Sequence, residues 1–159
     1  MTLAAAGLAR AFGPHRLVMA VFFLHAFVMT NWFPRIPDVQ AKLGVGPGDL
    51  SLGLLGSPVG TVLALPFAGA IVERLSPRRT IMIAFALYAV GICLPGLATD
   101  VPTLFAALFV YGLALPVVDV AMNVEADRIE RATGRRIMNT CHGFWSLGSI
   151  AGSVVGAGF

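Results

Sequence analysis

Long apolar runs alternate with short polar segments along the whole chain. A helix rises 1.5 Å per residue and a hydrocarbon core is about 30 Å thick, so a membrane span needs roughly 17 to 25 mostly apolar residues. Five runs meet this length, at residues 17–33, 50–72, 81–98, 103–124 and 139–159. The pattern predicts an all-α integral membrane protein of about five transmembrane helices, forming one region over residues 1–159.

The composition supports a chain built for lipid. Of its 159 residues, 57% are hydrophobic and only 12% are charged, far from the soluble average. The basic residues sit in short clusters between the apolar runs and form no continuous basic face, so we expect the lipid bilayer and no nucleic acid as partner. Cys93 and Cys141 lack the paired spacing of a zinc or redox site and are interpreted as small buried hydrophobes.

Lysine and arginine fall mostly on one side of the predicted spans. That side carries Arg10, Arg16, Arg74, Arg78, Arg79, Arg128, Arg131, Arg135 and Arg136, and the opposite side carries Arg35 and Lys42. Short cytoplasmic loops are enriched in these residues. The asymmetry predicts a multi-pass protein of the plasma (inner) membrane with a cytoplasmic N-terminus.

One carboxylate lies well inside an apolar span, at Asp119. An ionised carboxylate at that depth costs several kcal/mol unless it is paired, hydrated or protonated. Asp119 is therefore a candidate for proton coupling, and the alternative is a structural hydrogen bond to a neighbouring helix. The spacing of Gly112, Pro116, Asp119 and Asn123 places them on one helical face.

Two histidines lie in other spans, His25 in the first and His142 near the start of the fifth. An imidazole can relay protons or bind a polar group of a solute, although a single histidine is more often structural. With Asn31 at the end of the first span, they join Asp119 and Asn123 as candidate residues for solute binding or proton coupling. Asp119 and His142 should lie at comparable depth, and the sequence leaves their contact open.

Other chemistries find little support. The histidines and Asp119 come from three spans without local ligand spacing, so no metal site is expected. There is no ATP-binding motif and no cofactor is expected.

Three further patterns concern packing. Gly148, Gly152 and Gly156 recur every fourth residue, which predicts close approach of another helix. The third span has Tyr88 as its only strongly polar side chain and is expected to face lipid. Residues 125–136 mix acids and bases, with Asp127 and Arg131 four apart, and predict a short solvated cytoplasmic helix.

Residues 69–79 read Gly-Ala-Ile-Val-Glu-Arg-Leu-Ser-Pro-Arg-Arg. This segment resembles the signature loop of the major facilitator superfamily, Gly-x-x-x-Asp-Arg-x-Gly-x-Arg-Arg. Glu73 replaces the usual Asp and Ser76 the second Gly. The resemblance implies that the loop is part of a latch on the inner side of the membrane, with gating residues Gly69, Glu73, Arg74, Arg78 and Arg79.

A second likeness covers Met122-Asn123 and the run from His142 to Gly148, which is similar to bacterial members related to sugar permeases. A typical member of the superfamily has two six-helix halves, each built from inverted three-helix repeats. The resemblance implies an incomplete N-terminal half, one helix short and with the C-terminal half absent. It also implies that all but the third helix border a central cavity.

Taken together, these features predict a secondary active transporter of a small polar solute working by alternating access, and not an enzyme. Two alternatives stay open. One is a non-catalytic membrane subunit, and the other is a membrane-embedded hydrolase using Ser57, His142 and Asp119, for which no Gly-x-Ser-x-Gly motif is present.

Overall fold

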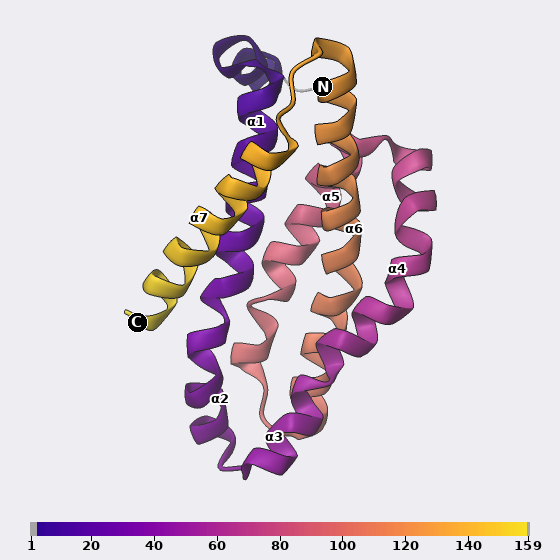
Figure 1. Ribbon diagram of the computed structural model, residues 1–159. Coiled ribbons are helices and arrows are strands. Elements are labelled where there is room, and N and C mark those ends of the chain that lie inside the picture. Colours follow the sequence, from indigo (N-terminus) through magenta and orange to yellow (C-terminus); the bar gives the residue numbers. More distant parts are fainter. Residues whose placement is uncertain (1–2, 159) are drawn as a thin grey trace.

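A computed structural model describes residues 3–158 of the chain, with side chains from Gly13 onward. Every element in that range is helical, and no strand occurs in it. The long helices run side by side as a bundle (Figure 1). The prediction of an all-α fold is confirmed.

The elements in chain order are α1 (Leu3–Asn31), η1 (Phe33–Arg35), α2 (Ile36–Leu43), α3 (Pro47–Leu54), α4 (Gly56–Leu75), α5 (Pro77–Gly91), η2 (Leu94–Leu97), α6 (Val101–Thr133) and α7 (Met138–Ala157). The two η elements are short 3₁₀ helices.

Four stretches of the described chain are long and apolar enough to cross a membrane. They are Gly13–Leu43, Pro47–Leu75, Pro77–Leu97 and Val101–Thr133. α7 occupies the fifth predicted span as a 20-residue helix. It is not among the four, because polar residues such as Asn139 and His142 interrupt its apolar sequence. That α7 crosses the membrane stays a prediction.

Local sequence explains where the longest helix begins and ends. Asp100 accepts a hydrogen bond from the backbone N–H of Thr103 at 2.8 Å, and the Thr103 side chain bonds back, which forms a capping box at the start of α6. Gly134 ends the helix with φ +67°, a conformation that favours glycine. Residues 125–133 are helical as predicted, but they continue α6 without a break, so the short helix expected over residues 125–136 is not an element of its own.

Glycines bring α4 and α6 into backbone contact. A Cβ at Gly56 or Gly60 would clash with the carbonyl oxygen of Phe105 or Phe109 on α6, respectively. A Cβ at Gly112 of α6 would clash in turn with a carbonyl oxygen of α4. Removal of side chains at such positions allows close helix packing in a membrane, so α4 and α6 form one tightly packed pair.

A second pair consists of α1 and α7. A Cβ at Gly148, Gly152 or Gly156 would clash with the carbonyl oxygens of Phe23, Phe27 and Asn31, respectively. The Thr30 hydroxyl adds a hydrogen bond to the carbonyl oxygen of Ser149 at 2.9 Å. The spacing of four residues on both helices keeps the contact continuous over two turns.

α5 packs on α6 with one face and is open on the other. Ala84, Tyr88 and Gly91 are buried, whereas Met82 and Leu87 are more than half exposed. The expectation that the third span faces lipid therefore applies to its open face only, because Tyr88 lies in the interior of the bundle.

Two apolar clusters hold the helices together. The larger contains Tyr88, Leu108 and Tyr111, and the smaller contains Phe22, Met122 and Cys141, where α1, α6 and α7 meet. The smaller cluster includes Ile137 in the α6–α7 loop, and this loop lies at the same end of the bundle as the α4–α5 junction (Figure 1). We call this end the arginine-rich end, because it contains Arg74, Arg78, Arg79, Arg135 and Arg136.

Candidate functional site

Asp119 lies on a face of α6 that the described helices leave uncovered. Its side chain is exposed, whereas Val118 and Ala121 beside it are buried. Asp119 therefore faces outward from a helix that is apolar enough to cross a membrane. A carboxylate in this position requires water, a partner or a proton.

His142 of α7 is the polar neighbour of Asp119. Its imidazole lies within electrostatic range of the Asp119 carboxyl group, and His142 is itself exposed. The His142 ring meets Phe22 of α1 edge to face, with centroids 5.4 Å apart. Two separate helices thus place an acid and an imidazole within electrostatic range of each other, both on exposed positions.

The polar stripe expected on α6 divides into two parts. Gly112 and Pro116 are buried, and Gly112 packs against α4. Asp119 and Asn123 lie on the same helical face farther along α6 and are exposed and half-buried, respectively. The ribbons of α4 and α6 diverge toward the end of the bundle where α4 joins α5 (Figure 1). The Asn123 side chain donates to the carbonyl oxygen of Asp119 at 2.9 Å. The crossing of the helices therefore decides which half of the stripe is accessible.

His25 lies inside the bundle, away from this open face. It is 2% exposed and stacks on Tyr88, with ring centroids 5.1 Å apart. Its Nδ1 is buried without a hydrogen-bond partner among the described residues. The structure does not bring His25 together with Asp119.

Asn31 lies where α1 meets α7. Its side chain is half-buried and donates to the carbonyl oxygen of Gly152 at 3.3 Å. This hydrogen bond joins α1 to α7, and it engages the Asn31 amide group at the interface between the two helices.

Only Ser76 separates α4 from α5, and the first turn of α5 forms an ion pair with α6. Nε of Arg78 donates to Oε1 of Glu125 at 2.7 Å. Glu125 is 4% exposed, and Arg128 lies 3.8 Å from its other oxygen. The pair connects the predicted gating loop to the helix that carries Asp119.

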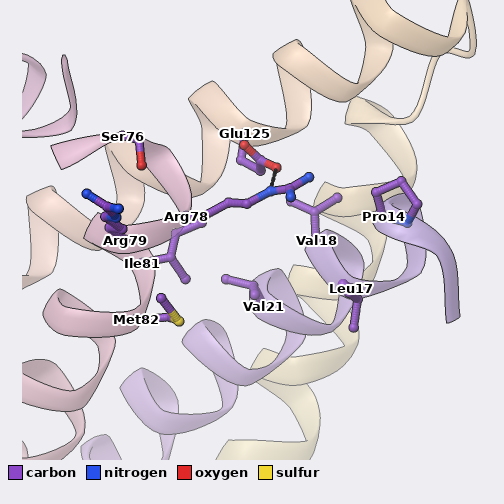
Figure 2. Close-up of a pocket in the computed structure, with 10 residues that line it drawn as sticks. All are labelled: Pro14, Leu17, Val18, Val21, Ser76, Arg78, Arg79, Ile81, Met82 and Glu125. Atoms are coloured by element: carbon purple, nitrogen blue, oxygen red, sulfur yellow. Dashed lines mark hydrogen bonds and ion pairs between the residues drawn. The ribbon is translucent and has the colours of Figure 1, made fainter. Parts of the chain in front are cut away.

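A cavity of about 420 Å³ lies beside this ion pair (Figure 2). Arg78, Arg79 and Glu125 form its polar part, and apolar side chains of α1 and α5 form the rest, among them Leu17, Val21, Ile81 and Met82. Neither Asp119 nor His142 lines it. The cavity therefore belongs to the loop and not to the open face of α6 and α7.

Ser76 adopts an unusual backbone conformation within that loop. Its φ is +72° and its ψ is 148°, a region that L-residues rarely occupy. Ser76 is the position where the resembling loop motif has glycine. Glycine adopts this conformation more readily than serine does.

The other predicted loop residues are exposed. Gly69 faces open space, since a Cβ there would meet no atom within 4 Å. Glu73, Arg74 and Arg79 form no ion pair within the described part of the chain. Their side chains are accessible at the arginine-rich end.

Sequence reasoning missed Glu125 as a site residue and treated its segment as solvated. A signal was present, because Glu125 falls at helical spacing among Ala121, Met122 and Ile129, all of which are buried. An acidic residue within an apolar helical stripe indicates a buried partner.

The open alternatives gain nothing from the geometry. In the described residues, no three His, Cys, Asp or Glu side chains gather as a metal site would require. Ser57 lies half-buried on α4, where its backbone packs against Gly112, and no hydrogen bond joins it to His142 among the described residues. A serine hydrolase requires such a bond between nucleophile and base.

Comparison with known proteins gives one family match. The sequence profile of the Major Facilitator Superfamily matches residues 18–159. No solved structure matches the chain with statistical significance.

Bacterial relatives agree with that match. An uncharacterised MFS-type transporter of Yersinia pestis is 35% identical over 132 residues, which cover 83% of this chain and 34% of that protein. An uncharacterised transporter of Sinorhizobium fredii is 31% identical over 143 residues, covering 90% of this chain and 38% of that protein. The membrane protein MosC of Rhizobium meliloti is 28% identical over 131 residues, which cover 82% of this chain and 32% of that protein. The chain thus spans about a third of the length of these relatives.

Proposed function

The chain belongs to the major facilitator superfamily, and we propose that it forms part of a secondary active transporter that moves a small polar solute across the membrane by alternating access. The observation that carries this proposal is the approach of Asp119 and His142 on the uncovered face of α6 and α7. Polar groups on such a face of membrane helices mark pathways for solutes or ions.

The chemistry of the two side chains suits proton coupling. A carboxyl group beside a water-filled cavity can take up and release a proton, and an exposed imidazole within electrostatic range can relay it. Asn123 and the exposed part of α7 add polar groups for a solute. We infer that further helices complete the binding site, an inference supported by the match of this chain to about a third of the length of its relatives.

The loop at the arginine-rich end acts as a gate in this proposal. Its resemblance to the superfamily's signature loop supports the role, and so does the ion pair of Arg78 with Glu125. Because Glu125 is on the same helix as Asp119, a movement of the loop is transmitted to the face that carries Asp119. Glu73, Arg74 and Arg79 are exposed and free to contact the rest of the transporter.

The membrane orientation is proposed from charge. The arginine-rich end faces the cytoplasm of a bacterial inner membrane, and Arg35 and Lys42 face the outside. The N-terminus is then cytoplasmic.

The central experiment uses Asp119→Asn in the full-length protein reconstituted in liposomes. Candidate polar solutes are screened for uptake that acidifies or alkalinises the vesicle interior. Asp119→Asn should abolish solute-dependent proton movement but should not affect equilibrium exchange of the solute. The reason is that asparagine keeps the shape of the aspartate side chain but does not titrate. His142→Gln should weaken the same signal.

Asp127→Asn is the matched control, because Asp127 is an exposed carboxylate that pairs with Arg131 at 2.8 Å on the solvated end of the same helix. It should leave both activities intact. Proton-coupled accumulation that survives Asp119→Asn at normal protein abundance refutes the coupling role.

A further inference from the structure

Three polar aromatic residues from three helices stack in the centre of the bundle. His25 of α1 and Tyr111 of α6 each stack on Tyr88 of α5, with centroid distances of 5.1 Å on both sides. All three side chains are buried. Nothing in the proposed transport site uses them.

Hydrogen bonds run along this stack. The Tyr111 hydroxyl donates to the Tyr88 hydroxyl at 3.3 Å, and the Tyr88 hydroxyl donates to the backbone carbonyl oxygen of His25 at 3.1 Å. The chain of bonds therefore ties α6 to α1 through α5. It ends on backbone, so its anchor on α1 does not depend on the imidazole.

The two groups of the proposed site belong to different helix pairs. Asp119 is on α6, which packs closely on α4, and His142 is on α7, which packs closely on α1. Contacts that join one pair directly to the other are far fewer. The position of His142 relative to Asp119 therefore depends on how the pairs are held together.

Several connections hold them. The apolar clusters around Phe22 and Met122 and around Tyr88 and Tyr111 have non-directional contacts that permit small sliding movements. At the arginine-rich end, Oε1 of Glu130 on α6 accepts hydrogen bonds from the backbone N–H groups of Ile137 and Met138, where α7 begins. Deeper in the bundle, the Tyr111–Tyr88–His25 chain supplies directional bonds between α6 and α1. His25 lies one helical turn after Phe22, and Phe22 contacts the His142 ring. A fixed turn of α1 at His25 thus fixes the surface against which His142 rests.

We propose that the Tyr111–Tyr88–His25 chain is a positioning element that sets the distance between α6 and α7 and so places His142 opposite Asp119. The role of this chain in transport rests on the function proposed above, whereas its effect on the distance between α6 and α7 does not. Tyr88 is the central member, because it takes part in both hydrogen bonds. It is a positioning residue and touches no solute.

The experiment measures the distance between α6 and α7 in the full-length protein, the form used in the transport assay, reconstituted in lipid nanodiscs. Spin labels are attached at Val124→Cys and Leu147→Cys, two exposed positions on these helices, in a background in which the native cysteines, Cys93 and Cys141 among them, are replaced. Double electron–electron resonance then gives the distance distribution. Tyr88→Phe removes both hydrogen bonds and keeps the stacked ring, and should shift or broaden the distribution by a helix displacement on the order of 1–2 Å.

Phe85→Leu is the control for packing alone, because Phe85 contacts the Tyr88 ring and makes no hydrogen bond in the chain. It should lower the melting temperature and leave the distance unchanged. Tyr111→Phe breaks only the bond to α6, and should produce a smaller shift in the same direction. If Tyr88→Phe does not fold, Tyr111→Phe decides the question by the same readout.

An unchanged distance in the folded tyrosine variants overturns the proposal, and so does an equal change in Phe85→Leu. The liposome transport assay of Asp119→Asn and His142→Gln tests the proposed function separately from the distance measurement. A shifted distance together with transport that is indifferent to Asp119 and His142 removes the proposed coupling role and leaves the positioning role intact.

Discussion

Arg78 and Glu125 form an ion pair with unequal access to water. Nε of Arg78 is 2.7 Å from Oε1 of Glu125, and the Arg78 side chain is 60% exposed whereas that of Glu125 is 6% exposed. Loss of Arg78 and loss of Glu125 therefore have different consequences. An Arg78 side chain without its partner reaches solvent, but a Glu125 side chain without Arg78 stays buried and keeps only Arg128, 3.8 Å from its other oxygen.

This asymmetry predicts that Arg78→Met destabilises the protein more than Glu125→Gln does. Arg78→Met should cost about 2 kcal/mol of unfolding free energy, because it leaves a buried carboxylate without its hydrogen-bond donor. Glu125→Gln should cost less than about 1 kcal/mol, and the double variant should recover most of the loss. Denaturant unfolding in detergent measures all three.

Arg79→Met is the control, because Arg79 is exposed and forms no ion pair in the described chain. It should change stability by no more than about 0.5 kcal/mol. Equal losses in Arg78→Met and Glu125→Gln would contradict the unequal exposure on which the argument depends.

The backbone at Ser76 predicts a stabilising substitution. Ser76→Gly should raise the unfolding free energy by about 1 kcal/mol, because glycine adopts the observed φ of +72° without the steric cost of a Cβ. Ser76→Ala keeps the Cβ and should leave stability nearly unchanged. Thermal unfolding of the three proteins in the same detergent tests this, and a gain in Ser76→Ala equal to that in Ser76→Gly would be incompatible with backbone strain.

The contact of α1 with α7 predicts strong sensitivity at Gly152. Gly152→Ala should destabilise the protein by about 1–3 kcal/mol, since the added methyl group must push against the carbonyl oxygen of Phe27 and the hydroxyl of Thr30. Gly143→Ala on the same helix meets no atom within 4 Å and should be neutral or slightly stabilising. Melting temperatures in detergent compare the two, and similar values would rule out a close approach at Gly152.

The proposed orientation predicts the behaviour of fused reporters. A reporter fused after Arg79 or after Arg136 should give the signal of a cytoplasmic location. A reporter fused after Lys42 or after Asp100 should give the signal of a location outside the membrane. The reason is the concentration of arginine at the end of the bundle that contains the α4–α5 junction. Reversed signals at these four positions would invert the assignment of sides.

Much of the helical architecture could be predicted from the sequence, because its causes are local. Apolar runs of membrane-spanning length indicated the long helices, and the structure contains a helix at each of the five runs. The pairing of Asp127 with Arg131, four residues apart, is also local, and the structure has it at 2.8 Å. Such features depend on the period of one helix and need no knowledge of its neighbours.

The partners of each helix face were decided by the tertiary structure alone. Glu125 pairs with Arg78, 47 residues earlier in the chain, and Tyr88 is buried between His25 and Tyr111 on two other helices. Gly112 and Asp119 share one face of α6, but α4 covers the first and not the second. The physical reason is that spacing along a helix sets the direction of a side chain, whereas its burial depends on where another helix crosses, and that crossing results from packing among all the helices together.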